Sequence, residues 1–185
     1  EETPGIFTNE EQEEAGETDE ELSVFSSEEV PEFNDTPDEA MVAAENEGID
    51  LANVSGGIYT ISSAGNYTFT CSKETENRIV VNGTISEPIN ICLNNVKIKT
   101  PYGPALQIAT NVPATVTIFL KGTNDLRATN GQSAGLQKDN KAPLIITTND
   151  LDITAAGSLN VINNGKGAGI GGGSGGNGEN ITING

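Results

Sequence analysis

Short runs in which apolar and polar residues alternate recur between residues 58 and 183 of the 185-residue chain. Each run is rich in β-branched residues and is bounded by Gly, Asn, Asp or Pro. Because side chains of a β-strand point to opposite faces in turn, this pattern predicts half-buried strands rather than amphipathic helices. The predicted strands contain residues 58–61, 67–70, 79–81, 89–91, 116–120, 144–146, 159–161 and 181–183.

A longer period is superimposed on this alternation. Residues 123–129 match residues 148–154 at an offset of 25, and residues 94–98 match the same pattern 30 residues earlier. After each unit a small-residue step leads into another strand, at residues 105–107, 134–137 and 168–170. A period of about 25 to 34 residues suits a coil of two or three strands with corner loops of unequal length. We therefore predict an all-β fold, a right-handed parallel β-helix (β-solenoid), for residues 50–185.

The repeat also aligns three asparagines. Asn124 shares a strand face with Leu126 and Ala128, which predicts that its amide points into the core. Amides stacked at one place in successive coils would hydrogen-bond along the column and satisfy the backbone of the corner. The sequence therefore predicts an inward asparagine ladder made by Asn94, Asn124 and Asn149.

Charge divides the chain into two parts. Residues 1–50 contain 19 of the 27 acidic residues and no Lys or Arg, whereas residues 51–185 contain eight acidic and nine basic residues. The first part has few apolar residues, and such a composition cannot bury enough apolar surface to offset the entropy of ordering it. We expect residues 1–49 to form an acidic, disordered N-terminal arm or linker, and we interpret it as a solvated spacer.

Composition excludes several classes of protein. The chain has no Trp and no His, and residues 51–185 contain no cluster of basic residues, which argues against nucleic-acid binding. No apolar run reaches the length of about 18 residues that a membrane-spanning helix needs. The glycine-rich run at residues 166–178 fits G-x-G-x-x-G but lacks the helix and the acidic residue of a dinucleotide site. We interpret its glycines as tight corners of a narrow solenoid.

Two segments resemble a known bacterial family. Residues 57–69 resemble its opening pattern "G-x-Y-x-I-x-x-x-G-x-Y-x-L/F", and residues 91–98 resemble its coil pattern "L-x-L-N-N/D-V-x-I". Residues 167–173 resemble the glycine-rich coils of large surface proteins of anaerobes. The family is the right-handed β-helix carbohydrate-binding domain of bacteria that grow on plant or host glycans. The resemblance covers residues 50–185 and describes the fold better than the ligand.

The resemblance implies a secreted or cell-surface module that binds plant or host polysaccharide, of the cellulose or pectin type, with calcium bound along the helix. The small number of acidic residues in the domain departs from a pattern of several calcium sites. An adhesive module fits the same resemblance. The alternative is a structural stalk that spaces another domain from the cell.

One group of charged residues stands out as a candidate metal site. Asp150 and Asp152 are two apart on a predicted strand, so both carboxylates project from one face, and the repeat places Asp125 one coil below Asp150. Carboxylate oxygens are the ligands that calcium prefers, so Asp125, Asp150 and Asp152 are the candidate calcium ligands. The alternative is that Arg127, stacked beneath Asp152, forms a surface ion pair.

The same residues bear on catalysis and on sugar binding. Some parallel β-helices are lyases that use an arginine base or hydrolases that use clustered aspartates, and Arg127 with its neighbouring aspartates is the group that could imitate either. General acid–base work needs paired groups in a cleft, and no cleft-building loop is evident, so we expect no enzyme. Tyr102, between Pro101 and Gly103, is predicted to be an exposed ring. The candidate carbohydrate-binding residues are Tyr102 and Arg127.

Two features stay open at this level. Cys71 and Cys92 are 21 residues apart, which permits either a disulfide between coils or two small apolar thiols. Residues 181–185 read as a strand without a polar cap, and a bare coil end exposes unpaired strand edges. We therefore expect the β-helix to continue into a longer, anchored surface protein, and we expect the isolated piece to associate end to end.

Overall fold

The computed structural model describes residues 48–148 and 156–184, which form an all-β fold of parallel sheets. Two short 3-10 turns, η1 (Leu51–Asn53) and η2 (Ser55–Gly57), precede the main run of strands. Within these ranges no helix has the length and apolarity needed to cross a membrane. The strands are β1 (Ile49–Asp50), β2 (Ile58–Ile61), β3 (Gly65–Thr70), β4 (Arg78–Val81), β5 (Ile89–Asn94), β6 (Lys97–Thr100), β7 (Leu106–Ile108), β8 (Val116–Lys121), β9 (Thr123–Ala128), β10 (Leu136–Lys138), β11 (Leu144–Thr148), β12 (Ser158–Asn163), β13 (Ile170–Gly171) and β14 (Ile181–Ile183).

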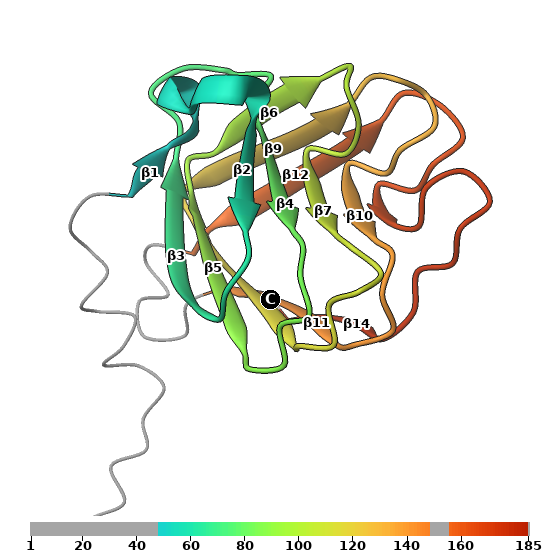
Figure 1. The fold of residues 1–185 in the computed structure, drawn as a ribbon. Coiled ribbons are helices and arrows are strands. Elements are labelled where there is room, and N and C mark those ends of the chain that lie inside the picture. The colour runs from blue at the N-terminus through green and yellow to red at the C-terminus, as the bar shows by residue number, and fades with distance from the viewer. Residues whose placement is uncertain (1–47, 149–155, 185) are drawn as a thin grey trace, which may run out of the picture. The chain divides into compact units, whose positions relative to one another are not determined.

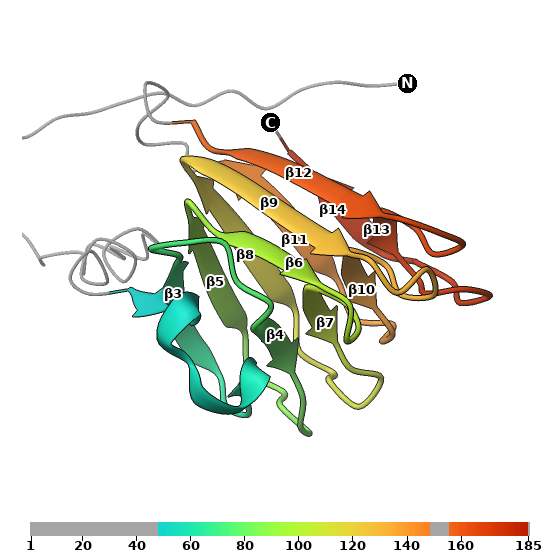
Figure 2. The ribbon, with the colours of Figure 1, turned by 90° about the horizontal axis from the view of Figure 1, so that it is seen from above.

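The strands form three sheets, and the chain visits them in a fixed order. The six-stranded sheet has the order β1-β3-β5-β8-β11-β14, the five-stranded sheet β13-β10-β7-β4-β2, and the three-stranded sheet β12-β9-β6. From β5 onward the chain passes from the six-stranded to the three-stranded to the five-stranded sheet, and it repeats this path through β8–β10 and β11–β13 (Figure 1). Figure 2 shows β6, β9 and β12 side by side as one layer. The predicted all-β class is confirmed, with parallel pairing throughout the named sheets.

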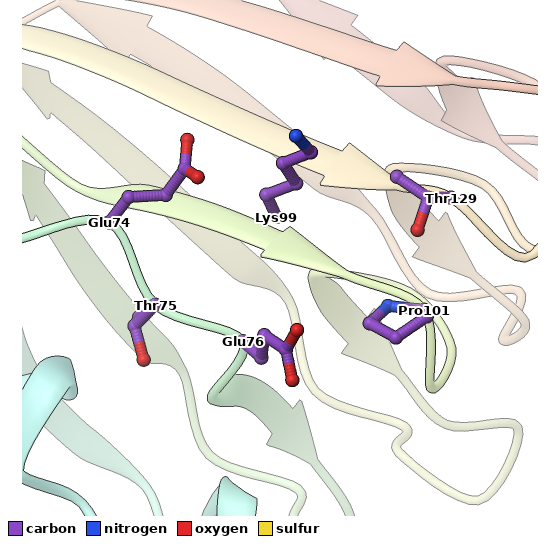
Figure 3. A pocket seen from close by; sticks show the side chains of 6 residues that line it. All are labelled: Glu74, Thr75, Glu76, Lys99, Pro101 and Thr129. Atoms are coloured by element: carbon purple, nitrogen blue, oxygen red, sulfur yellow. The ribbon is translucent and has the colours of Figure 1, made fainter.

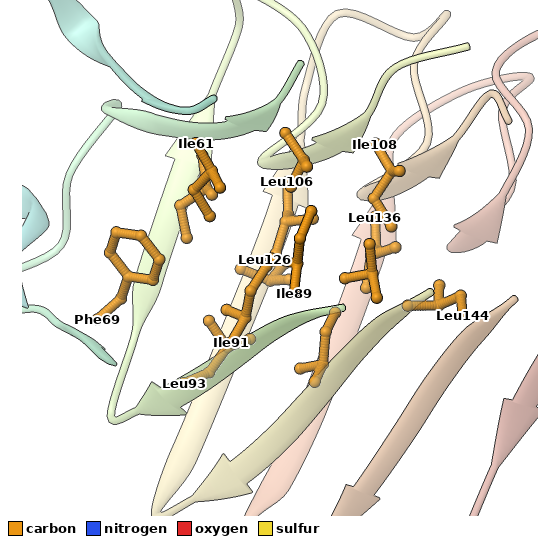
Figure 4. Packing of buried hydrophobic residues seen from close by; sticks show 14 of the residues in the cluster. Ile61, Phe69, Ile89, Ile91, Leu93, Leu106, Ile108, Leu126, Leu136 and Leu144 are labelled. Atoms are coloured by element: carbon orange, nitrogen blue, oxygen red, sulfur yellow. The ribbon is translucent and has the colours of Figure 1, made fainter. Parts of the chain in front are cut away.

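Apolar side chains stack in columns between the sheets. In the six-stranded sheet Ile91 pairs with Ile118, which pairs with Ile146, and all three are buried. Polar or half-buried residues alternate with them, which is the period-two pattern that the sequence shows. Figure 4 shows side chains from all three sheets meeting in this cluster, including Leu106 of β7 and Leu126 of β9.

The aromatic side chains near the start of the fold close one end of this core. Phe69 is fully buried, and its ring lies 5.1 Å from that of Tyr59 at an interplanar angle of 76°. An edge-to-face pair of this kind is a favourable arrangement for two aromatic rings. Tyr67 also packs against the core, on the same face of β3 as Phe69.

The predicted asparagine ladder is wrong. Asn94 is half-buried and pairs with Lys121 of β8, whereas Asn124 is fully buried and pairs with Leu159 of β12. Asn149 lies outside the described residues. Asn124 does satisfy the backbone of a corner, and Asn95 rather than Asn94 assists it, with its Oδ1 accepting from the Thr123 N–H.

The error comes from register. The sequence match aligned residues 123–129 with residues 148–154, whereas Thr148 ends β11 and pairs with Leu120 of β8. The strand that lies beside β9 is β12, where Asn160 pairs with Asp125. The apolar residues of a buried strand face fix the register of strand pairing, whereas a similarity between polar residues does not fix it. Leu126 pairs with Ile98 and Val161, which keeps the apolar column continuous.

Candidate functional site

The outer face of the three-stranded sheet carries charged side chains in pairs. In β6 Ile98 and Thr100 are buried, so Lys97 and Lys99 point outward. In β9 the buried positions are Asn124, Leu126 and Ala128, and the outward positions are Asp125 and Arg127. Lys97 pairs with Asp125 and Lys99 with Arg127, so opposite and like charges alternate across the sheet.

A segment before β4 extends this face by one strand position. Thr75 forms a parallel bridge with Ile98, with its N–H donating to the Lys97 carbonyl at 3.1 Å and its carbonyl accepting from the Lys99 N–H at 2.9 Å. This pairing brings Glu74 and Glu76 beside the two lysines. We call this surface, made of Glu74, Glu76, Lys97, Lys99, Asp125 and Arg127, the charged face.

The charged face contains a shallow hollow of about 380 Å³. Glu74, Glu76 and Lys99 lie around it, and Thr75 lies on the side of the segment before β4 (Figure 3). Pro101 and Thr129 complete the lining at the end of the strands. Within the part of the chain that the structure describes, Lys99, Glu74 and Glu76 form no ion pair. The hollow therefore offers one ammonium and two carboxylates to a ligand.

Tyr102 stands at the same end of the charged face. Its side chain is 73% exposed, which confirms the prediction of an exposed ring in this loop. The buried Thr100 accepts a hydrogen bond from the Tyr102 N–H through its Oγ1 at 3.2 Å, and the Thr129 N–H donates to the Thr100 carbonyl at 2.9 Å. These bonds fix the turn that carries Tyr102 beside Pro101.

Arg127 and Asp125 form a close ion pair on this face. The Arg127 Nε donates to both carboxylate oxygens, at 2.7 and 2.9 Å, and Nη2 donates to Oδ2. This hydrogen bonding favours the charged guanidinium and raises the pKa of Arg127 above its usual value. A guanidinium has five N–H donors, so three remain for a ligand.

The predicted metal site of Asp125, Asp150 and Asp152 stays a prediction, although the neighbours of Asp125 in the sheet differ from the expected ones. In β12, which pairs with β9, Asn160 rather than Asp150 lies beside Asp125, and Ile162 rather than Asp152 lies beside Arg127. The physical reason is the register shift described above. Asp150 and Asp152 themselves lie outside the described residues, and among the described ones no group of three His, Cys, Asp or Glu could hold a metal ion.

A larger hollow of about 710 Å³ lies at the corner between the five-stranded and six-stranded sheets. Two polar side chains of its lining, Asp139 and Asn140, are poorly available to a ligand. Asp139 accepts hydrogen bonds from Gln107 and Gln137 at 2.8 to 3.0 Å. The Oδ1 of Asn140 has no protein partner among the described residues, but it is buried. That atom fits an internal water better than a ligand in the hollow.

The glycine-rich segment and the cysteines have structural roles. A Cβ on Gly172 would lie 2.4 Å from the backbone of Gly176, so glycine allows a close backbone contact here. Gly175 has a φ of 76°, as expected for the tight corners that the sequence predicts in this run. Cys71 and Cys92 are thiols and do not form a disulfide. Burial raises the pKa of the Cys71 thiol, which disfavours its reactive thiolate.

Comparison with known families places the chain in a family. A family model described as "Carbohydrate-binding domain-containing protein" matches residues 55–174, well over half of the chain. The chain belongs to this carbohydrate-binding domain family. Neither the curated proteins nor the solved structures gave a match. Every residue that lines the charged-face hollow lies inside the region that matches the carbohydrate-binding family.

The family is described by binding rather than by a reaction, which agrees with the expectation of a binding module. Of the two residues predicted to bind carbohydrate, Arg127 lies on the charged face and Tyr102 lies at its edge. The sequence prediction missed Glu74, Glu76 and Lys99. The alternation in residues 97–100 could have identified Lys99 as an outward residue of a strand, but the bridge at Thr75 depends on a contact between distant segments.

Proposed function

We propose that the protein binds polysaccharide through the charged face, as a non-catalytic module. The observation that carries this proposal is the family match over all the residues that line the hollow. A sugar hydroxyl both donates and accepts hydrogen bonds. Glu74 and Glu76 supply acceptors, while Lys99 supplies donors. Hydrogen bonds to charged groups are stronger than neutral ones, so a few of them suffice to orient a sugar.

The charge balance of this face favours a hydroxyl-rich polymer over a highly charged one. Glu74, Glu76 and Asp125 are offset by Lys97, Lys99 and Arg127, so the six charges cancel. Long-range attraction therefore contributes little, and recognition depends on short-range hydrogen bonds. The exposed ring of Tyr102 supplies an apolar contact at the edge of the hollow.

We further propose that the three sheets are the faces of a right-handed parallel β-helix. The repeated path through the six-, three- and five-stranded sheets supports this arrangement, as does the parallel pairing between successive turns of the chain. Crossovers between parallel strands are right-handed in nearly all known sheets. Such a solenoid presents flat, elongated faces, which suit an extended polymer.

An extracellular or surface-attached setting, where plant or host polysaccharides occur, is part of the same proposal. The alternative is a stalk that only spaces other domains and needs no ligand. The two proposals differ in one respect. A stalk requires no hollow lined by charged side chains, and the charged face has one, whose Glu74, Glu76 and Lys99 form no ion pair with another described residue.

A co-sedimentation assay of the full chain with a panel of insoluble plant and host polysaccharides tests the proposal. We expect at least one to retain the protein, and we expect Lys99→Ala to weaken retention about tenfold, as for loss of a hydrogen bond to a charged group. Lys166→Ala is the matched control, because it removes an exposed ammonium outside the charged face. Absence of retention on every polysaccharide, or equal retention of both variants, would contradict the charged face as the binding surface.

A further inference from the structure

The outer face of the six-stranded sheet differs chemically from the charged face. Its first outward column has one residue from each of five strands of this sheet, β3, β5, β8, β11 and β14. These residues are Asn66, Asn90, Thr117, Ile145 and Thr182. The Asn90 amide donates to the Asn66 Oδ1 at 2.8 Å, so the column begins as a side-chain amide pair. These five side chains carry no charge.

The second outward column places an aromatic ring near the centre of the sheet. Phe119 lies between Cys92 of β5 and Thr147 of β11, and Thr68 of β3 begins the column. The neighbours of Phe119 along its strand, Ile118 and Leu120, are buried, so the half-buried ring of Phe119 points outward. We call these two columns the neutral face.

Among the described outward positions of this sheet, charged side chains lie at one margin only. Asp50 of β1 pairs with Thr70, and Lys121 of β8 pairs with Asn94, which places both charges in the third column at the ends of the strands. The neutral face itself combines the apolar side chains of Cys92, Phe119 and Ile145 with hydroxyl and amide groups on either side.

We propose that the neutral face is a second carbohydrate surface, which takes an uncharged polysaccharide by contact between Phe119 and the apolar face of a sugar ring. A pyranose ring has C–H groups on its faces and hydroxyls at its rim. The ring of Phe119 can pack against the C–H groups, and the flanking threonines and asparagines can hydrogen-bond to the hydroxyls. A face without charges also leaves no buried ion to desolvate when a neutral polymer covers it.

This inference rests on the proposed function only for the class of partner, a saccharide. Because the neutral and charged faces belong to different sheets, each has its own key side chain, Phe119 or Lys99. One molecule that holds a polymer on each face cross-links two polymer chains. A module with a single site does not.

Binding of the full chain to crystalline cellulose, an uncharged polymer with flat ring faces, tests the inference. We expect Phe119→Ala to bind about tenfold more weakly, the size expected for the loss of a desolvated aromatic contact, while Phe119→Tyr keeps the ring and retains binding. Val80→Ala is the matched control, because Val80 is a half-buried outward residue of the five-stranded sheet. Equal binding of Phe119→Ala and the wild-type chain would overturn the proposal.

A second measurement uses the unaltered protein, so it holds even if Phe119→Ala fails to fold. Soluble cello-oligosaccharide should slow alkylation of Cys92, which lies beside Phe119, and leave the rate at Cys71 unchanged, because Cys71 packs against the core. Equal rates at Cys92 with and without the sugar would overturn the neutral face. Loss of binding in Lys99→Ala but not in Phe119→Ala would support the charged face alone, and the reverse result would support the neutral face alone.

Discussion

The carboxylate of Asp125 is held by the guanidinium of Arg127 two residues further along β9, through three N–H···O contacts. The two residues project from the same face of one strand. Each side chain neutralises the charge that the other would otherwise present to a ligand. Asp125 is therefore poorly placed to coordinate a cation. Arg127 keeps three N–H donors, held in one orientation by the ion pair.

Calcium affinity tests this relationship. We expect Asp125→Asn to leave calcium binding of the full chain unchanged, because the carboxylate it removes is already bound to Arg127. Isothermal titration of both proteins with calcium measures the comparison. A weakening of about tenfold or more in the variant, the usual effect of losing a ligand or its close support, would show that Asp125 coordinates the ion.

Asn124 joins three successive turns of the chain. Its Oδ1 accepts from the Val96 N–H at 2.9 Å, and its Nδ2 donates to the carbonyls of Lys121 and Ser158 at 3.1 Å. We expect Asn124→Ala to lower the free energy of unfolding by about 2–4 kcal/mol, because buried backbone groups lose their partners. Asn94→Ala is the control and should cost less, since Asn94 is half-buried and faces outward. Urea denaturation measures both, and equal losses would contradict a special role for the hydrogen bonds of Asn124.

The contrast between Asn124 and Asn94 shows how far the sequence could predict this fold. Alternation along each strand identified the strands and their inward faces, because that signal is local. The pairing of strands depends on the lengths of the loops between them. Residues 148–154 resemble residues 123–129 in sequence, but Thr148 pairs with Leu120 and β9 pairs with β12. Polar similarity carries little register information when the apolar column decides the packing.

The candidate site was predictable to a similar degree. Tyr102 could be identified because Pro101 and Gly103 mark an exposed turn, and Arg127 because its strand alternates. Glu74 and Glu76 join the site through a single bridge between Thr75 and Ile98, which no local pattern reveals.

Lys138 gives a pH-dependent prediction. The residue is 1% exposed, its Nζ donates to the Asn140 carbonyl at 2.7 Å, and burial lowers the pKa of its ammonium. The unfolded chain therefore binds more protons than the folded one between that lowered pKa and about 10.5. Stability should rise through this window as pH increases. We expect the free energy of unfolding of the wild-type chain to rise relative to that of Lys138→Met as pH approaches about 10.5. Urea titrations at pH 7 to 10 measure the difference, and a constant difference would contradict it.

Gly157 gives a prediction from backbone contact alone. A Cβ at this position would lie 2.3 to 2.5 Å from the backbone of Leu120 and Lys121, where the antiparallel bridge between Lys121 and Ala156 forms. Backbone atoms cannot rotate away, so we expect Gly157→Ala to lower the free energy of unfolding by about 2 kcal/mol or more. Gly131→Ala is the control, since a Cβ there meets nothing within 4 Å despite a φ of 75°. Thermal unfolding of the two variants should distinguish the cost of backbone contact from that of conformational strain. An equal loss of stability in both variants would show that strain alone destabilises Gly157→Ala.

Backbone amide chemical shifts recorded during titration with a polysaccharide fragment test the charged face as a binding surface most directly. The fragment would come from the polymer that retains the protein in co-sedimentation. We predict that the largest changes cluster at the amides of residues 74–76, Lys99, Tyr102 and Thr129, around the hollow of the charged face. Large changes confined to the five-stranded sheet, or none at saturating sugar, would contradict it.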